Sequence, residues 1–208
     1  MVPRRLTRAI RREETVKKSR FVTRLLPVAD PAEVKALVDA VRKAEFGARH
    51  HATAMVIGPD RSHQRSSDDG EPAGSAGAPM LEVLRRERVT DVLAIVSRHF
   101  GGVLLGKAGL IRAYGGGVAA AVAAAAFETQ QPQLGFEVRV RLAEAGRTDH
   151  LLRVLAGKWE HGIVRASYGE DAVFELWLPP EAAPAVTESL GGTGQIRALG
   201  QRLVTMAE

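Results

Sequence analysis

A stretch without hydrophobic periodicity constrains this chain more than any other segment. Residues 65 to 79 read RSSDDGEPAGSAGAP and hold three carboxylates, three glycines and two prolines. Such a density of Gly and Pro cannot continue a helix or a β-ladder, so turn chemistry must set the shape of the segment. The carboxylates of Asp68, Asp69 and Glu71 repel one another unless a cation or N–H donors compensate their negative charge. We therefore predict that this acidic loop has a defined shape and contacts a cation, an arginine or backbone N–H groups.

A second glycine-rich loop follows one predicted strand later. Residues 98 to 117 read RHFGGVLLGKAGLIRAYGGG and supply the cations Arg98, Lys107 and Arg112. Within it, G-x-x-x-x-G-K resembles a phosphate loop, but Ala108 stands where such a loop needs Ser or Thr to hold Mg²⁺. Two interpretations stay open: backbone N–H groups at a helix N-terminus bind a phosphate, or the cations simply answer the acidic loop.

The acidic residues also have two interpretations. Carboxylate oxygens suit Mg²⁺ or Ca²⁺, but D-D-G-E is not the spacing of an EF-hand. Histidines 50, 63 and 99 show no HxH or HExxH spacing that would indicate a transition metal. His50 and His51 would point to opposite faces of a strand, so at most one could join a site. We favour acids that cap N–H groups and pair with Arg98 or Arg112, and predict no metal and no cofactor.

Composition narrows the class of protein. The 208-residue chain contains no cysteine, which excludes disulfides, thiolate zinc sites and a cysteine nucleophile, and suits a reducing cytoplasm. The longest apolar run, Val118 to Phe127, is about half of what crosses a bilayer, so no membrane partner is predicted. Residues 1 to 24 hold nine Lys or Arg against two Glu. We expect residues 1–16 to form a basic arm, either solvated or in contact with phosphates.

The first predicted domain covers residues 17–130. Asp30 as cap and Pro31 in the first turn indicate the start of a helix that ends near Gly47. The other predicted elements are strands at 21–28, 52–57 and 92–96 and helices at 80–86 and 110–127. The acidic loop is expected to run from the strand at 52–57 to about Pro79. Both signature loops leave core elements and are predicted to meet at one edge.

The second predicted domain covers residues 135–208, after a linker at 130–135 that contains Pro132. Its predicted elements are strands at 136–142, 163–168, 172–178 and 195–205 and helices at 148–159 and 181–190. The order βαββαβ is that of the ferredoxin-like split. We therefore predict an α+β protein of two domains.

The two loops also carry a family resemblance. The patterns SDDGEP-x-G-[ST]-A-G-x-P at 67–79 and R-[YH]-F-G-G-x-x-L-G-x-x-G-L-x-R-A-Y-G at 98–115 resemble the signature of the YigZ/IMPACT family. The resemblance implies an N-terminal domain like the second domain of a small-subunit ribosomal protein and domain IV of elongation factor G, a βαβ fold, and a ferredoxin-like C-terminal domain. Both kinds of domain contact RNA in translation. Tyr114, in the second pattern, joins the candidate site.

Two functions from different classes remain. The first is a non-enzymatic cytoplasmic protein that binds RNA, the ribosome or translation factors, with a role in translation regulation and with Arg98, Lys107 and Arg112 on phosphates. The second is a small-molecule hydrolase or other enzyme whose pocket, formed by the two signature loops, holds His50, Asp68, Asp69 and Glu71, although no G-x-S-x-G elbow surrounds the nearby serines. Family members commonly carry Asn-Cys where this chain has His51-Ala52, so chemistry that uses a thiol there fails in this chain.

Overall fold

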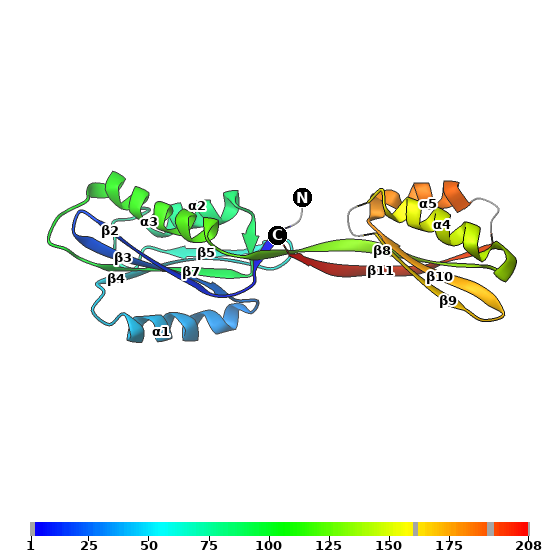
Figure 1. Ribbon diagram of the computed structural model, residues 1–208. Coiled ribbons are helices and arrows are strands. Elements are labelled where there is room, and N and C mark those ends of the chain that lie inside the picture. The colour runs from blue at the N-terminus through cyan, green and yellow to red at the C-terminus, as the bar shows by residue number, and fades with distance from the viewer. Residues whose placement is uncertain (1–2, 160–161, 191–193, 208) are drawn as a thin grey trace. The chain divides into compact units, whose positions relative to one another are not determined.

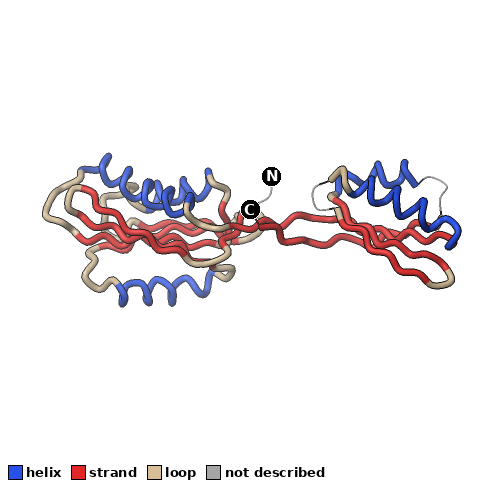
Figure 2. The backbone as a smooth tube through the Cα atoms, in the orientation of Figure 1, coloured by secondary structure: helices blue, strands red, loops and turns tan. Residues whose placement is uncertain are grey.

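The structure is a computed structural model that describes residues 3–159, 162–190 and 194–207. The chain forms two compact units, which we call unit 1, up to Thr129, and unit 2, Gln130–Met206. None of the helices in the described ranges is both long and apolar enough to cross a membrane. Figure 2 shows the helices, strands and loops along the chain.

Unit 1 is built on a five-stranded antiparallel sheet with the order β2-β3-β7-β4-β5. Helices α2 and α3 cover one face and α1 covers the other (Figure 1). A short β1 pairs with β6 and with the start of β8, Phe127–Arg141. The bounds are β1 Arg4–Leu6, β2 Ile10–Val16, β3 Ser19–Pro27, α1 Val34–Ala44, β4 His50–Ile57, β5 His63–Ser67, α2 Gly77–Arg86, β6 Val89–Thr90, β7 Val92–His99 and α3 Gly106–Ala123.

The two faces of this sheet have separate cores because side chains alternate along a strand. On β4, Ala52, Ala54 and Val56 pack toward α2 and α3, whereas Met55 and Ile57 pack toward α1. The same alternation divides β7. The central strand β7 is therefore apolar on both faces from Val92 to Val96, and its polar residues, 97–99, lie at its end.

Helix α1 begins as the sequence predicts. Asp30 Oδ1 accepts a hydrogen bond from the Ala32 backbone N–H at 2.8 Å, and Pro31 opens a 3₁₀ turn, Pro31–Glu33, that leads into the helix. A short acceptor side chain before the first turn satisfies an N–H group that has no partner inside the helix. The cap and the proline together fix where the chain leaves β3.

Four strands of unit 1 were not predicted: the short β1 and β6, and the two edge strands β2 and β5. Residues 4–6 and 10–16 form β1 and β2 and are therefore not a free arm, while residues 1–2 of the predicted arm lie outside the described residues. β2 pairs with β3 through a two-residue turn in which Lys17 and Lys18 both have positive φ, +45° and +69°. A two-residue turn with two positive φ angles is usually recognised in a sequence by the pair Asn-Gly, which is absent here. Likewise β5 occupies residues assigned to the acidic loop. Both strands lie at sheet edges and are mostly polar and exposed, so they lack hydrophobic alternation.

Unit 2 has the predicted element order of strand, helix, strand, strand, helix, strand. Its sheet has the order β11-β8-β10-β9, and α4 and α5 pack together on it around a core that includes Leu152, Phe174 and Leu176 (Figure 1). The bounds are β8 Phe127–Arg141, α4 Ala145–Ala156, β9 Ile163–Tyr168, β10 Asp171–Leu178, α5 Ala183–Leu190 and β11 Gln195–Ala207.

The predicted linker at 130–135 is wrong, because these residues continue β8. Pro132 lies between the residues of β8 that pair with β1 and those that pair with β10. Proline has no backbone N–H to donate to a ladder. At this position, neither of those two ladders loses a hydrogen bond because of it. The predicted helix at 110–127 is also shifted: α3 covers Gly106–Ala123, and Phe127 begins β8.

Gly101 allows the loop after β7 to touch the turn between β2 and β3. A Cβ atom on Gly101 would lie 1.9 Å from the Lys18 carbonyl oxygen, whereas a Cβ on Gly116, inside α3, would meet nothing within 4 Å. We expect Gly101→Ala to lower the free energy of unfolding by about 2 kcal/mol or more, because backbone must move. Gly116→Ala should raise it by about 0.5–1 kcal/mol, since alanine favours a helix.

Chemical denaturation of both variants measures the difference. The two substitutions add the same methyl group, so they differ only in the space around it and in helix propensity. An equal effect of both on the denaturation midpoint would contradict the assigned contact.

Candidate functional site

A buried ion pair joins the two signature loops. Arg98, at the end of β7, donates from one terminal nitrogen to both Glu71 carboxylate oxygens, at 2.8 and 3.1 Å. Tyr114 on α3 donates its hydroxyl to Glu71 Oε1 at 2.7 Å. All three residues are buried. The predicted meeting of acidic loop and basic loop is thereby confirmed, with Arg98 as the cation that answers Glu71.

Tyr114 and Arg98 are further fixed by aromatic neighbours. The rings of Tyr114 and Phe21 of β3 pack edge to face, with 5.4 Å between their centroids. The central carbon of the Arg98 guanidinium lies 5.7 Å from the Phe21 ring centroid and 5.4 Å from that of Phe100. Burial raises the pKa of Tyr114 far above its usual value, and the hydrogen bond to Glu71 adds to the shift. Tyr114 is thus a permanent hydrogen-bond donor to the carboxylate.

Asp68 shapes the acidic loop from within. Its carboxylate accepts backbone N–H groups from Gly74 at 2.8 Å and from Ala76 and Gly77 at 2.9 Å. Burial alone would raise the pKa of Asp68, but these three donors hold it below its usual value. The predicted capping role of an acid is confirmed here, since the donors precede and open α2.

Asp69 turns toward the other face of the sheet. It has a positive φ of +48°, pairs with Arg42 of α1 through Oδ1, and accepts the His51 backbone N–H at 2.7 Å through Oδ2. Its carbonyl oxygen lies 2.8 Å from His50 Nδ1. A carbonyl only accepts, so His50 Nδ1 carries a hydrogen.

His50 lines a cavity of about 350 Å³ beside the ion pair. Its wall combines the acidic loop, the end of β7 and the start of α3, and both Arg98 and Glu71 belong to it. The cationic residues of the wall are Arg49, Arg98 and Lys107. Arg49 and Lys107 are exposed, and neither forms an ion pair with any described residue. Among the residues that line the cavity, three cations therefore stand against one acid, Glu71.

Arg112 does not join this cavity, and its predicted pairing with the acidic loop is wrong. Lys107, Leu110 and Tyr114 follow one another at spacings of three and four along α3 and share one helix face. Arg112 lies five residues from Lys107, which turns it about 140° away on the helix. It is exposed and has no ion pair among the described residues.

Sequence reasoning missed the apolar part of the site. Phe100 is 40% exposed and Leu104 is 82% exposed, and both line the cavity, while the neighbouring Leu105 is buried in the core. The signal was present in the run Val103-Leu104-Leu105, which is too apolar for a loop that wraps phosphates. In the structure this loop exposes Leu104 to solvent, whereas Leu105 packs into the core and holds the loop in place. Arg49 was missed because it belongs to neither signature pattern.

A second polar cluster lies on the α1 face. Glu45, just after α1, is buried and accepts from Arg24 at 2.6 Å, and its other carboxylate oxygen lies 3.0 Å from His99 Nε2. His51 Nδ1 lies 2.8 Å from the Ser97 hydroxyl on the same face, and burial lowers the pKa of His51. His50 and His51 thus occupy opposite faces, as predicted. No three His, Asp or Glu side chains gather as a metal site in residues 3–159, 162–190 and 194–207.

The fold and the site define a two-unit α+β protein whose first unit carries two interlocked signature loops. Residues 17–122 match the family model described as the Impact N-terminal domain. The chain is 39% identical over 168 residues to IMPACT family member YigZ of Escherichia coli (strain K12), covering 80% of each chain. It is also 37% identical to an IMPACT family member of Thermus thermophilus, covering 79% of this chain and 87% of that one.

A solved structure described as a hypothetical protein aligns with 96% of this chain and 97% of its own, at 32% identity and a TM-score of 0.60. The chain belongs to the IMPACT family. The model match covers both signature loops and every candidate residue between His50 and Tyr114.

The buried ion pair predicts a large and unequal loss of stability. Glu71→Gln leaves the Arg98 charge uncompensated in the interior, so we expect the free energy of unfolding to fall by about 3–5 kcal/mol. Tyr114→Phe removes one hydrogen bond to a carboxylate and should cost about 1.5–3 kcal/mol. Urea denaturation of the single and double variants gives a coupling energy. Strictly additive effects would contradict a shared contact.

The α1-face cluster predicts how stability depends on pH. Burial alone would raise the pKa of Glu45, but hydrogen bonds from Arg24 and His99 lower it from 4.5 to about 2. A depressed folded-state pKa stabilises the protein above the unfolded value and loses that effect as pH falls toward 2. Glu45→Gln should therefore be destabilised by about 3 kcal/mol at pH 7. The difference from the parent should vanish between pH 4.5 and 2.

Thermal or urea denaturation at a series of pH values measures this difference. Asp39→Asn on α1 is the matched control, because Asp39 pairs with Lys35 on an exposed helix face. A pH-independent gap between the parent and Glu45→Gln would overturn the assignment.

Proposed function

We propose that this protein is a non-enzymatic, cytoplasmic RNA-binding protein of the translation machinery, and that a backbone phosphate of RNA occupies the cavity beside the Glu71–Arg98 ion pair. One observation carries the proposal: Arg49 and Lys107 of the cavity wall are exposed and form no ion pair with a described acid, because the carboxylate oxygens of each nearby acid already have other partners. The charge of Lys107 helps to lower the pKa of Asp68, but the two do not form an ion pair. Asp68 is bound by backbone N–H groups, Asp69 by Arg42 and His51, and Glu71 by Arg98 and Tyr114.

The cations have distinct tasks in this proposal. Lys107 and Arg49 contact the phosphate directly, since their charges reach solvent at the cavity. Arg98 is a positioning residue whose charge is balanced by Glu71, and Arg112 plays no part. The start of α3 adds the backbone N–H groups of a helix N-terminus, which favour an anion.

The exposed apolar residues at the cavity suit a nucleic acid better than a free phosphate. Phe100 and Leu104 stand beside the cations, where an unpaired base can stack on the ring while its phosphate meets Lys107. Single-stranded and looped RNA is commonly bound through aromatic side chains and cations in this way. We therefore propose an unpaired or bulged segment of a structured RNA as the ligand.

The architecture supports the same proposal. We assign residues 17–130 to the domain type of ribosomal proteins and of elongation factor G domain IV, and residues 135–208 to the ferredoxin-like type. The order β11-β8-β10-β9, with both helices packed on that sheet, supports the second assignment. The resemblance stated above connects both types with RNA contact in translation.

The alternative of a small-molecule hydrolase draws less support. His50 and Glu71 share the cavity, but a general base needs a carboxylate that is free to take a proton. The lowered pKa of Asp68 makes it a weak base, and Glu71 would have to give up its bond to Arg98. We infer that the three acids build the site and do not act on a substrate.

An RNA-binding titration tests the proposal. Using a fluorescein-labelled RNA hairpin and anisotropy, we expect the dissociation constant to rise steeply with salt as counterions are released. Lys107→Ala should weaken binding and reduce the slope of log affinity against log salt by about 0.7–0.9. Arg112→Ala, on the other face of the same helix, should change neither. Binding without salt dependence, or equal effects of the two variants, would contradict the site.

A further inference from the structure

The sheet of unit 1 ends in a strand with an open side. β5, His63–Ser67, is the last strand of the order β2-β3-β7-β4-β5 and pairs with β4 alone among the described strands. The outer side of such a strand presents N–H and C=O groups that a further strand can bind. This edge lies in the first unit but is separate from the cavity of the proposed RNA site.

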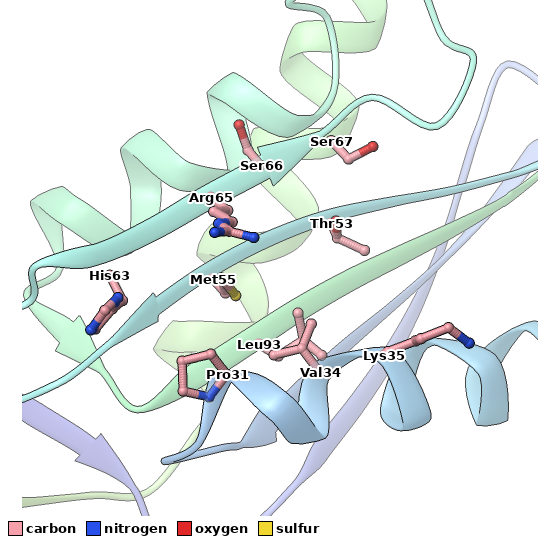
Figure 3. A pocket seen from close by; sticks show the side chains of 10 residues that line it. All are labelled: Pro31, Val34, Lys35, Thr53, Met55, His63, Arg65, Ser66, Ser67 and Leu93. Carbon is pink, nitrogen blue, oxygen red and sulfur yellow. The ribbon is translucent and has the colours of Figure 1, made fainter.

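A second cavity opens beside this edge, on the α1 face of the sheet. It measures about 400 Å³ and lies between the start of α1 and strands β4 and β5, as Figure 3 shows. Val34, Met55 and Leu93 give it an apolar floor. Four residues of β5 line the cavity: His63, Arg65, Ser66 and Ser67. His63, Arg65 and Ser67 belong to the face of the strand on which the cavity lies, and Ser66 belongs to the opposite face.

The cavity carries positive charge that the protein does not neutralise. None of its ten lining residues is an Asp or Glu. Lys35 of α1 is paired with Asp39 at 2.7 Å, whereas Arg65 forms no ion pair with any residue that the structure describes. The edge therefore favours an occupant with carboxylates.

We propose that β5 binds an extended acidic segment of another protein, which adds to the sheet as a further strand. The main chain of the segment pairs with the outer side of β5. On the α1 face, one of its carboxylates meets Arg65 and an apolar side chain two residues away enters the cavity. Main-chain bonds supply affinity in this mode, and the pocket for alternate side chains supplies specificity.

A second copy of this chain fits the edge poorly. If two β5 strands paired antiparallel with full overlap, Arg65 would stand opposite Arg65, and like charges directly opposite each other are destabilising. The other sheet edge, β2, is also a poorer site. Its Arg11 and Glu13 pair with each other at 2.7 Å, and the cavity near it measures only about 40 Å³.

A designed peptide tests the proposal on the full chain. The probe is the capped heptapeptide Thr-Glu-Thr-Val-Thr-Glu-Thr, whose two glutamates and valine share one face of a strand. We expect saturable chemical-shift changes in residues 63–67 and at the start of α1, and slower amide exchange in β5. Arg65→Glu should weaken binding by about tenfold, because an attraction becomes a repulsion. Lys43→Glu, an equal charge change on α1 outside the cavity, should not.

Backbone methylation separates strand addition from simple charge attraction. Alternate residues of a paired strand direct their N–H groups to the same neighbour. N-methylation of either the even-numbered or the odd-numbered residues of the probe should therefore abolish binding, and methylation of the other set should leave it intact. Equal behaviour of the two methylated probes would overturn the proposal. So would unchanged affinity in Arg65→Glu, given an unchanged denaturation midpoint.

Discussion

The buried contact between Glu71, Arg98 and Tyr114 is the constraint on which the first unit depends. A buried charge is tolerated only when a partner of opposite charge lies at hydrogen-bond distance. Separating Glu71 from Arg98 would leave both charges uncompensated in the interior, which is strongly destabilising. It joins the acidic loop, the end of β7 and the middle of α3, three segments that are distant in the chain. The cavity beside it exists because these segments are held at fixed positions.

Strand alternation then divides the polar residues between two faces. His50 and Arg98 belong to the face of α2 and α3, while His51, Ser97 and His99 belong to the face of α1. Asp69 touches both groups, since its carboxylate meets Arg42 and His51 and its carbonyl meets His50. One residue with positive φ thereby connects two clusters that the sheet separates.

The sequence predicts most of what depends on periodicity and on charge. The central strands, the helices and the pairing of Arg98 with the acidic loop followed from apolar runs, from capping residues and from crowded carboxylates. The edge strands β2 and β5 could not be predicted, because a polar edge strand has no hydrophobic pattern and a Lys17-Lys18 turn gives no glycine signal. Arg112 was misplaced because a motif gives spacing, whereas the helix turn decides which face a residue takes.

The engagement of the acids has a chemical consequence for the whole site. A carboxylate that accepts three backbone N–H groups, as Asp68 does, stabilises its charged form and resists protonation. Asp69 and Glu71 are held by arginines, so a proton on either would break a contact that shapes a loop. The acids of the signature therefore act on the fold, and the cavity residues that remain for a ligand include Arg49, Lys107, His50 and the exposed side chains of Phe100 and Leu104. The proposal of a bound RNA phosphate rests on this composition, in which cations stand beside a flat apolar ring.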